Sequence, residues 1–398
     1  MKNNIQNCML PVYEVNKTEF VSGSGSYLYD SNGTKYLDFF SGYAVTSLGH
    51  DSKIVKQAIE DQLKTGIMLT AVNDYYASQP VDLANKLCEL TFGDKVFFGN
   101  SGAESVELAI KVAKKYFNSK KLNQDLLPEI ISFKDAFHGR TNGAIALSDL
   151  PKLYKGFEPL MPNVHFADFN DIKSVKSKIN SKTCAIIIEP IQGQGGLKIA
   201  TKEFMQELKN LCNKYDIALI FDEVQTGNSR TGKLYAYQNY NIEPDIMATA
   251  KGLGGGFPIS ACIMNQKFAD AMTVGSHGTT FGGGQMATAV GLAVLNEISS
   301  NHLLDNVKKI SEFMLNELSE IQKKYPNTIN KTDGLGLMIG VWLNEKYNNE
   351  ETIAKLLSKG LISTGANGNM IRFLPPLNLS LEDAKEGLKI FEKVIESL

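Results

Sequence analysis

The chain has 398 residues, of which 43% are apolar and 21% are charged, so at roughly 150 residues per domain it holds two or three compact units. Its 41 Lys and Arg nearly balance its 43 Asp and Glu, leaving a formal net charge of −2 and no long block of one sign. These values argue against extensive disorder, nucleic-acid binding and an anionic membrane partner. They favour a small-molecule partner.

The cysteines and the N-terminus indicate the cellular context. No CxxC pair and no cluster of His is present, so we predict no metal site. Met1 to Val15 lacks the apolar core of a signal peptide, and no apolar run of about 18 residues occurs. The sequence therefore predicts a reduced, cytoplasmic protein without membrane spans. The five widely spaced cysteines are Cys8, Cys88, Cys184, Cys212 and Cys262.

Between about residues 95 and 265, short apolar strands alternate with amphipathic helices, which is typical of an open, mostly parallel α/β sheet. One helix has a buried face starting at Val106, and a later one has Phe204 and Tyr215 at the ends of its face. The predicted strands are Lys95–Phe98, Glu129–Phe133, Ala185–Ile188, Ile217–Phe221 and Ile259–Met264.

Beyond about residue 300 the pattern changes to a long helix with Val307 and Ile321 on one face, a strand region at 337–343, and a final helix beginning near Ser380. Ser380 and Asp383 form a capping pattern. We predict a large domain at 51–300 and a smaller α+β domain at 301–398. Turn signals within residues 1–50 indicate a segment that joins the smaller domain or forms an arm.

Polar residues follow four predicted strands at the point where each ends. They are Asn100–Ala103, Phe137–Thr141, Glu189 and Asp222. Ligands in open α/β sheets bind outside the carboxyl ends of the strands. Any one of these residues could simply cap the next helix, but four together favour a ligand site.

Ser101 and Glu104 allow two interpretations. They match a plain capping box. The same geometry also lets the Ser101 hydroxyl and the N–H groups of Gly102 and Ala103 bind a phosphate at the helix N-terminus. No Lys or Arg lies between Gly99 and Ser105, so a phosphate would need a further donor from elsewhere.

Lys251 follows the apolar run 245–250 and enters the glycine-rich turn 252–256. A lysine buried beside glycines suits a neutral amine, and Schiff-base chemistry uses one. A surface lysine with a buried stem is the simpler alternative. A nucleotide-binding loop is a third, although the glycines match GxGxxG poorly.

Three ordered motifs carry a specific resemblance: Phe221–Gly227, Arg230–Gly232 and Ala250–Gly256. Together they resemble the signature of class III pyridoxal-phosphate aminotransferases, the acetylornithine and ornithine aminotransferase family. The resemblance implies a fold-type-I transferase with a mostly parallel central sheet flanked by helices and a smaller α+β domain. Further matching motifs along almost the whole chain are 36–39, 47–50, 100–104, 137–141, 189–193, 280–283 and 371–376.

The resemblance implies a cofactor, pyridoxal 5′-phosphate, and a role for each residue around it. Lys251 would hold the cofactor as a Schiff base and then move the proton between substrate and cofactor carbons. Asp222 would keep the pyridine nitrogen protonated. Gln225 would reach the ring hydroxyl, and Phe137 and Val224 would cover the two ring faces.

The family pattern also implies that the site is shared in a homodimer. Thr280 of the neighbouring subunit would supply the donor that the phosphate site at Ser101 lacks.

Substrate recognition is implied by two arginines. Glutamate and 2-oxoglutarate carry two carboxylates, and Arg372 and Arg140 would bind one each; a structural salt bridge is the alternative for Arg140. Glu189 would pair with Arg372 when the amino donor has no carboxylate beside the reacting carbon. Tyr43 departs from the family pattern and would touch the substrate tail.

The resemblance implies transfer of the terminal amino group of N-acetylornithine to 2-oxoglutarate, in arginine biosynthesis. The alternatives are succinylornithine, ornithine, 4-aminobutyrate and succinyl-diaminopimelate aminotransferases, a glutamate-1-semialdehyde aminomutase and, from another class, a nicotinamide-dependent dehydrogenase. His50 and His138 lie in family motifs that predict packing roles. Val106, Asn228 and Gln285 are further departures that remove no catalytic group.

Overall fold

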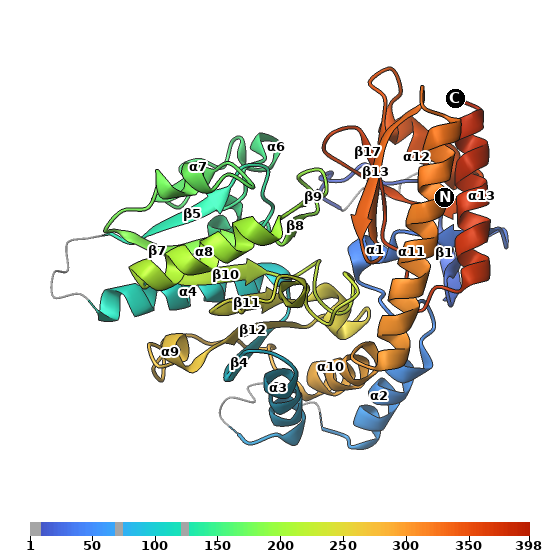
Figure 1. Cartoon of the computed structure of the whole chain (residues 1–398). Helices are drawn as coiled ribbons and strands as arrows, with labels where there is room; N and C mark the ends of the chain where they lie inside the picture. Colours follow the sequence, from blue (N-terminus) through green and yellow to red (C-terminus); the bar gives the residue numbers. More distant parts are fainter. Residues whose placement is uncertain (1–8, 68–74, 121–126) are drawn as a thin grey trace.

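The computed structural model describes residues 9–67, 75–120 and 127–398. A seven-stranded sheet lies at its centre in the order β4-β12-β11-β10-β7-β5-β6 (Figure 1). β12 is antiparallel to β11 and β4, and the other neighbours are parallel, so the mostly parallel sheet is confirmed. The strands are β4 (Lys95–Gly99), β5 (Glu129–Phe133), β6 (Val164–Ala167), β7 (Thr183–Ile188), β10 (Ala218–Asp222), β11 (Ile246–Thr249) and β12 (Ser260–Met264).

Both faces of this sheet are buried, because alternate strand residues enter two different apolar clusters. Ile187 and Ile220 pack with the α4 helix on one face. Ile188 and Phe221 join the cluster that contains α8 on the other face. Strands covered on both sides are continuous apolar runs, and this is why they could be recognised in the sequence.

Helices and short elements surround the sheet. They are α1 (Ser41–Ala44), α2 (Lys53–Lys64), α3 (Ser78–Leu90), α4 (Gly102–Ser119), α5 (Asn142–Ala146), α6 (Pro151–Tyr154), α7 (Ile172–Lys176), β8 (Ile191–Gln192), β9 (Lys198–Ile199), α8 (Lys202–Tyr215), η1 (Ala236–Asn239), η2 (Lys251–Gly254), α9 (Gln266–Ala269) and α10 (Gln285–Ile298).

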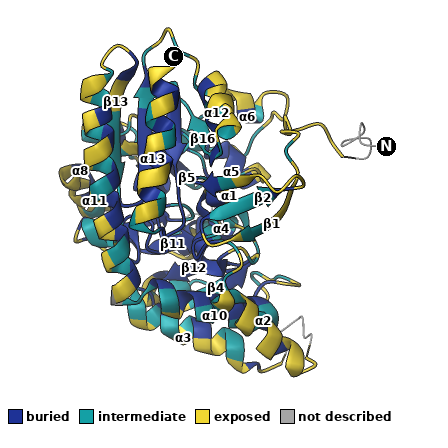
Figure 2. Ribbon diagram, turned by 90° about the vertical axis from the view of Figure 1, so that its right-hand side faces the viewer, coloured by how far each residue is buried: buried dark blue, intermediate teal, exposed yellow. Residues whose placement is uncertain are grey.

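The two ends of the chain meet beside the sheet. β3 pairs in parallel with β15, so the N-terminal strands extend a sheet that the C-terminal part completes. Figure 2 shows α11 and α13 with exposed outer faces and buried inner faces. The domain boundaries at residues 50 and 300 stay a prediction. The elements are β1 (Phe20–Ser24), β2 (Tyr27–Asp30), β3 (Lys35–Asp38), α11 (Asn301–Lys324), β13 (Ile329–Leu335), β14 (Met338–Leu343), α12 (Asn349–Ser358), β15 (Leu361–Ile362), β16 (Thr364–Ala366), β17 (Met370–Phe373) and α13 (Leu381–Glu396).

The predicted start of the final helix is confirmed, but one residue predicted to lie on a buried helix face is not buried. Ser380 caps α13 by accepting a hydrogen bond from the Asp383 N–H at 3.0 Å. Tyr215 is an error in the prediction: it is 48% exposed, because it is the last residue of α8 and Asp216 turns the chain into the left-handed region.

A buried arginine ties the C-terminal part to the loop that follows β10. Arg230 donates from Nη1 to the carbonyl oxygens of Leu337, at 3.0 Å, and Pro375, at 2.5 Å. In return, the Leu337 N–H donates to the Arg230 carbonyl at 2.9 Å. The segment that carries Arg372 is therefore fixed against the loop that follows Asp222.

Candidate active site

A cavity of about 700 Å³ opens at the carboxyl ends of the sheet strands. Its size suits a small-molecule site. Arg372 does not line the cavity but contacts Gln225, which does, and Thr280 lies outside the lining. The predicted residues that line the cavity are Tyr43, Ser101, Gly102, Ala103, Phe137, Arg140, Glu189, Asp222, Val224, Gln225 and Lys251.

Lys251 is delivered into the cavity directly after β11, in η2, with a left-handed φ of 45°. The preceding Ala250 carbonyl accepts a hydrogen bond from Asn228 Nδ2 at 2.9 Å, which fixes the strand end. Burial lowers the pKa of the Lys251 amine to about 8, against the attraction of Asp222. A nucleophilic neutral amine is therefore accessible near physiological pH.

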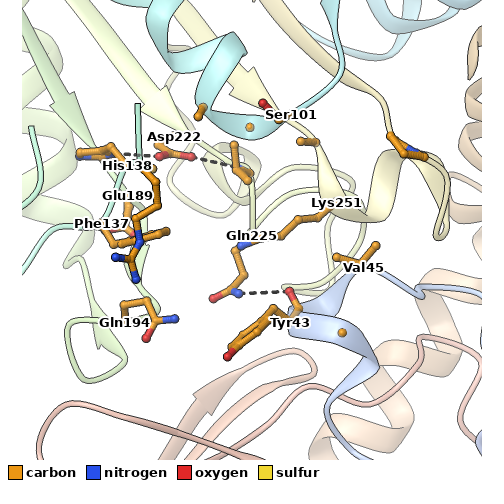
Figure 3. Close-up of a pocket in the computed structure, with 18 of the residues that line it drawn as sticks. Tyr43, Val45, Ser101, Phe137, His138, Glu189, Gln194, Asp222, Gln225 and Lys251 are labelled. Atoms are coloured by element: carbon orange, nitrogen blue, oxygen red, sulfur yellow. Dashed lines mark hydrogen bonds and ion pairs between the residues drawn. The ribbon is translucent and has the colours of Figure 1, made fainter. Parts of the chain in front are cut away.

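Asp222 is 5% exposed and already engaged on both oxygens (Figure 3). Oδ2 lies 2.7 Å from His138 Nδ1, and Oδ1 accepts the Val224 N–H at 3.0 Å. Burial acts to lower the pKa of His138, but the hydrogen bond and charge of Asp222 outweigh it and raise that pKa. His138 therefore donates a hydrogen bond to Asp222 and orients the carboxylate.

The structure places His138 differently from its predicted packing role. Its backbone N–H donates to Ser148 Oγ at 2.9 Å, which anchors the residue beside the cavity. Its Nε2 is buried without a partner in the described chain. No spacing in the sequence connects His138 with Asp222; its position beside Phe137, at a strand end, was the available signal.

Glu189 and Arg372 lie on opposite sides of one residue, Gly193. Glu189 accepts the N–H groups of Phe137, at 2.9 Å, and Gly193, at 3.4 Å. Arg372 Nη1 donates to the Gly193 carbonyl at 2.7 Å. No ion pair joins Glu189 to Arg372 in the described structure. To form the pair that the resemblance implies, both side chains would have to leave their present partners. Burial raises the pKa of Glu189 to about 7, with Asp222 adding to the effect.

Arg372 has hydrogen-bonding capacity in reserve. Its Nε and Nη2 are buried without partners in the described residues, and Nη1 also donates to Gln225 Oε1 at 3.2 Å. Gln225 Nε2 in turn donates to the Tyr43 carbonyl at 3.2 Å. A guanidinium with unpaired N–H groups suits bidentate binding of a carboxylate.

The N-terminus of α4 forms another wall. Ser101 Oγ accepts the Glu104 N–H at 3.3 Å, so the predicted cap is present. A Cβ atom at Gly102 would come within 2.6 Å of Val224, so only glycine lets the helix approach the loop after Asp222. Glu104 is turned outward and accepts the Asn100 N–H at 2.7 Å. The free N–H groups of this 18-residue helix face the cavity as an anion-binding end.

Tyr43 and Arg140 lie at the open rim. Tyr43 is 45% exposed and its ring packs edge-on against Phe40 at 4.5 Å. The Arg140 guanidinium lies 5.9 Å from the Phe137 ring centre and makes no ion pair with any described residue, so the structural salt bridge considered for it is absent from the described chain. Both side chains are available to a bound molecule.

Two other predicted features lie apart from the cavity. Thr280 is exposed in the 278–284 segment. His50 pairs with Asp38 at 2.8 Å, which agrees with a packing role. Within the described residues, no cluster of His, Cys, Asp and Glu is arranged to hold a metal ion, and no helix there is both long and apolar enough to cross a membrane.

A comparison with protein families distinguishes the aminotransferase prediction from the dehydrogenase alternative. The model of the class-III aminotransferases matches residues 12–395. The chain is a class-III aminotransferase. The predicted family and enzyme class are thus confirmed, and a nicotinamide-dependent dehydrogenase is excluded.

Individual relatives of this class-III aminotransferase agree. It is 41% identical to a succinylornithine transaminase of Yersinia pseudotuberculosis over 98% of its own length and 95% of the relative. It is 41% identical to an acetylornithine aminotransferase of Aquifex aeolicus over 95% of its length and 96% of the relative. A Toxoplasma gondii ornithine aminotransferase, solved with partial occupancy of PLP at its active site, has a TM-score of 0.93 and 27% identity, covering 99% of this chain and 93% of that one. These likenesses confirm the predicted transferase fold.

Proposed function

We propose that this aminotransferase moves the terminal amino group of N-acetylornithine to 2-oxoglutarate, as a step in arginine biosynthesis. The products are N-acetylglutamate 5-semialdehyde and glutamate. The observation that carries the proposal is the cavity floor, where a lysine of lowered pKa shares one site with the buried Asp222–His138 pair. The relatives that act on acylated ornithines support the choice of donor.

The cavity fits pyridoxal 5′-phosphate as the cofactor. The α4 N-terminus at Ser101, Gly102 and Ala103 offers N–H groups to a phosphate, and Gly102 leaves room that any Cβ would fill. The Asp222 carboxylate, oriented by His138, suits a pyridine nitrogen. When bound, the cofactor supplies an electron-withdrawing ring that stabilises negative charge on the reacting carbon.

The chain's own residues supply the proton chemistry around it. The Lys251 amine, mostly neutral above a pH of about 8, would be the base that takes a proton from the substrate carbon and delivers it to the cofactor carbon. The Asp222 carboxylate, oriented by the hydrogen bond from His138, would stabilise positive charge on the bound cofactor. Phe137, Val224 and Gln225 would position the ring.

Two arginines would bind the ends of a dicarboxylate. Arg372, with unpaired Nε and Nη2, would take the carboxylate beside the reacting carbon, and Arg140 at the rim would take the distal one. A donor that presents its terminal amine places no carboxylate beside Arg372. Glu189, which contacts the same Gly193, would then neutralise the Arg372 charge. One site would thus accept both substrates in turn.

Donor profiling tests this function. Purified enzyme is incubated with 2-oxoglutarate and one amine at a time, and glutamate formation is measured. We expect the highest kcat/KM with acylated ornithines and lower values with ornithine and 4-aminobutyrate. Activity without any 2-oxoglutarate would instead support an aminomutase.

We further propose a homodimer in which Thr280 reaches the cofactor phosphate of the partner subunit. The loop lies against the end of β4, since a Cβ at Gly282 would come within 2.4 Å of the Phe98 carbonyl, and Phe281 is 66% exposed. Mixing inactive Lys251→Ala protein with an inactive Thr280 variant should restore some activity through hybrid dimers. A fully active monomer would contradict the shared site. We also propose a cytoplasmic location, on the widely spaced cysteines of the sequence.

A further inference from the structure

The short helix α6 brings a lysine to the cavity that the proposed reaction does not use. Lys152 lines the cavity, and so do Leu150 and Leu153 on either side of it in sequence. Leu150 and Leu153 form a buried cluster with Ile145, against which Phe137 packs. The helix is therefore fixed to the same wall as Arg140, while Lys152 itself is exposed.

The charges around the cavity are unevenly distributed. The carboxylates of the lining, Asp222 and Glu189, lie buried on the floor and already accept hydrogen bonds. At the rim, Arg140 and Lys152 carry positive charge, and neither makes an ion pair or hydrogen bond with the described residues. The rim therefore offers two unpaired cations to whatever enters, and this arrangement attracts a molecule with two negative groups.

The acyl group of the donor determines how many carboxylates the cations at the rim can bind. An N-acetylated ornithine has one carboxylate, which Arg140 can bind. An N-succinylated ornithine carries a second carboxylate at the far end of its acyl chain. The lysine ammonium is a compact charge on a flexible stem and accepts a carboxylate in many orientations, as the end of a mobile chain requires.

We propose that Lys152 binds the distal carboxylate of an N-succinylated amino donor. This assignment rests on the proposed function and adds a specificity residue to it. Lys152 favours donors whose acyl group ends in a carboxylate over donors whose acyl group ends in a methyl group. It takes no part in proton transfer, because the buried Lys251 amine supplies the base, whereas Lys152 is exposed.

The test compares Lys152→Gln with a matched control, Lys155→Gln. Lys155 directly follows α6, is equally exposed and does not line the cavity. Kinetics are measured with N-succinylornithine and N-acetylornithine at saturating 2-oxoglutarate, and the KM for 2-oxoglutarate is measured separately.

Lys152→Gln should lower kcat/KM for N-succinylornithine about three- to tenfold, mostly through KM, as expected for one partly exposed charge pair. N-acetylornithine and 2-oxoglutarate should change less than twofold, and Lys152→Arg should restore most of the loss. Lys155→Gln should match the wild type with both donors.

Three results would overturn the assignment. Equal losses with both acylated donors would mean that Lys152 supports the cavity wall rather than selecting the acyl group. A raised KM for 2-oxoglutarate would assign Lys152 to the acceptor. A wild-type enzyme active with N-acetylornithine and inactive with N-succinylornithine would refute this assignment alone, whereas inactivity with both would refute the proposed function as well.

Discussion

The floor and the rim of the cavity are built on opposite principles. On the floor, Asp222 and Glu189 are buried and every carboxylate already has hydrogen-bond donors. At the rim, Tyr43, Arg140 and Lys152 are exposed, and neither cation has a counter-ion among the described residues. The floor is organised before any substrate arrives, while the rim is completed by the substrate's own charges.

This difference separates chemistry from selection. A change on the floor should slow every reaction of the enzyme, because both half-reactions use the same base and the same buried carboxylate. A change in an arginine or lysine that meets the substrate should affect only the molecules that carry the matching carboxylate. The following experiments test this division.

The largest effect is expected from Lys251→Ala, which removes the base. Turnover should be abolished with every donor, while the protein still binds the cofactor non-covalently through the α4 N-terminus. Lys251→Arg keeps the positive charge but not a neutral amine, and should be equally inactive. Product formation is measured by coupled assay and cofactor binding by absorbance; substantial residual transamination would refute the role of Lys251.

Asp222→Asn removes the charge; the amide oxygen can still accept the hydrogen bond from His138 Nδ1, while the amide NH2 group then faces the Val224 N–H without a hydrogen bond. Losing a preorganised charge in a buried site should slow single-turnover rates about 10²- to 10³-fold in both half-reactions. Thermal unfolding of the variant serves as the control for folding. Single-turnover rates near the wild-type values would assign Asp222 to another role.

Arg372→Ala should weaken the glutamate half-reaction by about 2–5 kcal/mol in kcat/KM, since a charge-assisted contact to a buried carboxylate is lost. The acylornithine half-reaction should change much less, because that donor places no carboxylate beside the reacting carbon. The two half-reactions are followed separately by stopped-flow absorbance. Equal losses would contradict the division of work between Arg372 and Arg140.

The smallest effect concerns pH. Because burial lowers the pKa of Lys251 to about 8, the neutral amine fraction should rise about tenfold between pH 6 and 7 and level off above pH 8. The rate at which apoprotein captures pyridoxal 5′-phosphate should follow this curve, whereas the rate with free Nα-acetyl-lysine should keep rising to about pH 10. A midpoint near the ordinary lysine value would show that the amine is not desolvated.

The sequence predicted the centre of the fold better than its edges. Strands buried on both faces, such as β7 and β10, differ from the predicted ranges by at most a few residues at each end. β6 was missed because it is a short edge strand with His165 in its middle and partly exposed residues. The N-terminal strands β1, β2 and β3 were missed because they are short and mostly exposed or half-buried, and only β3 pairs with a strand, β15, more than 300 residues later.

The candidate site was predicted residue by residue through resemblance, and the geometry brings most of those residues into one cavity. The sequence could not predict contacts between side chains that are far apart along the chain. His138 and Asp222 are 84 positions apart, and neither carries a local signal of the other. Lys152 was missed because a lysine that follows a proline is typical of an ordinary surface position.

The hydrogen bonds of Arg230 affect which mutations this enzyme tolerates during evolution. The groups that hold its guanidinium are main-chain carbonyl oxygens of Leu337 and Pro375, and most single amino-acid replacements leave such oxygens in place. Replacements of the exposed side chains between residues 337 and 375 therefore leave these contacts, and with them the alignment of Arg372 with the sheet, unchanged. An insertion that shifts these carbonyls would be far more damaging than most replacements, because it would strand a buried cation without its acceptors.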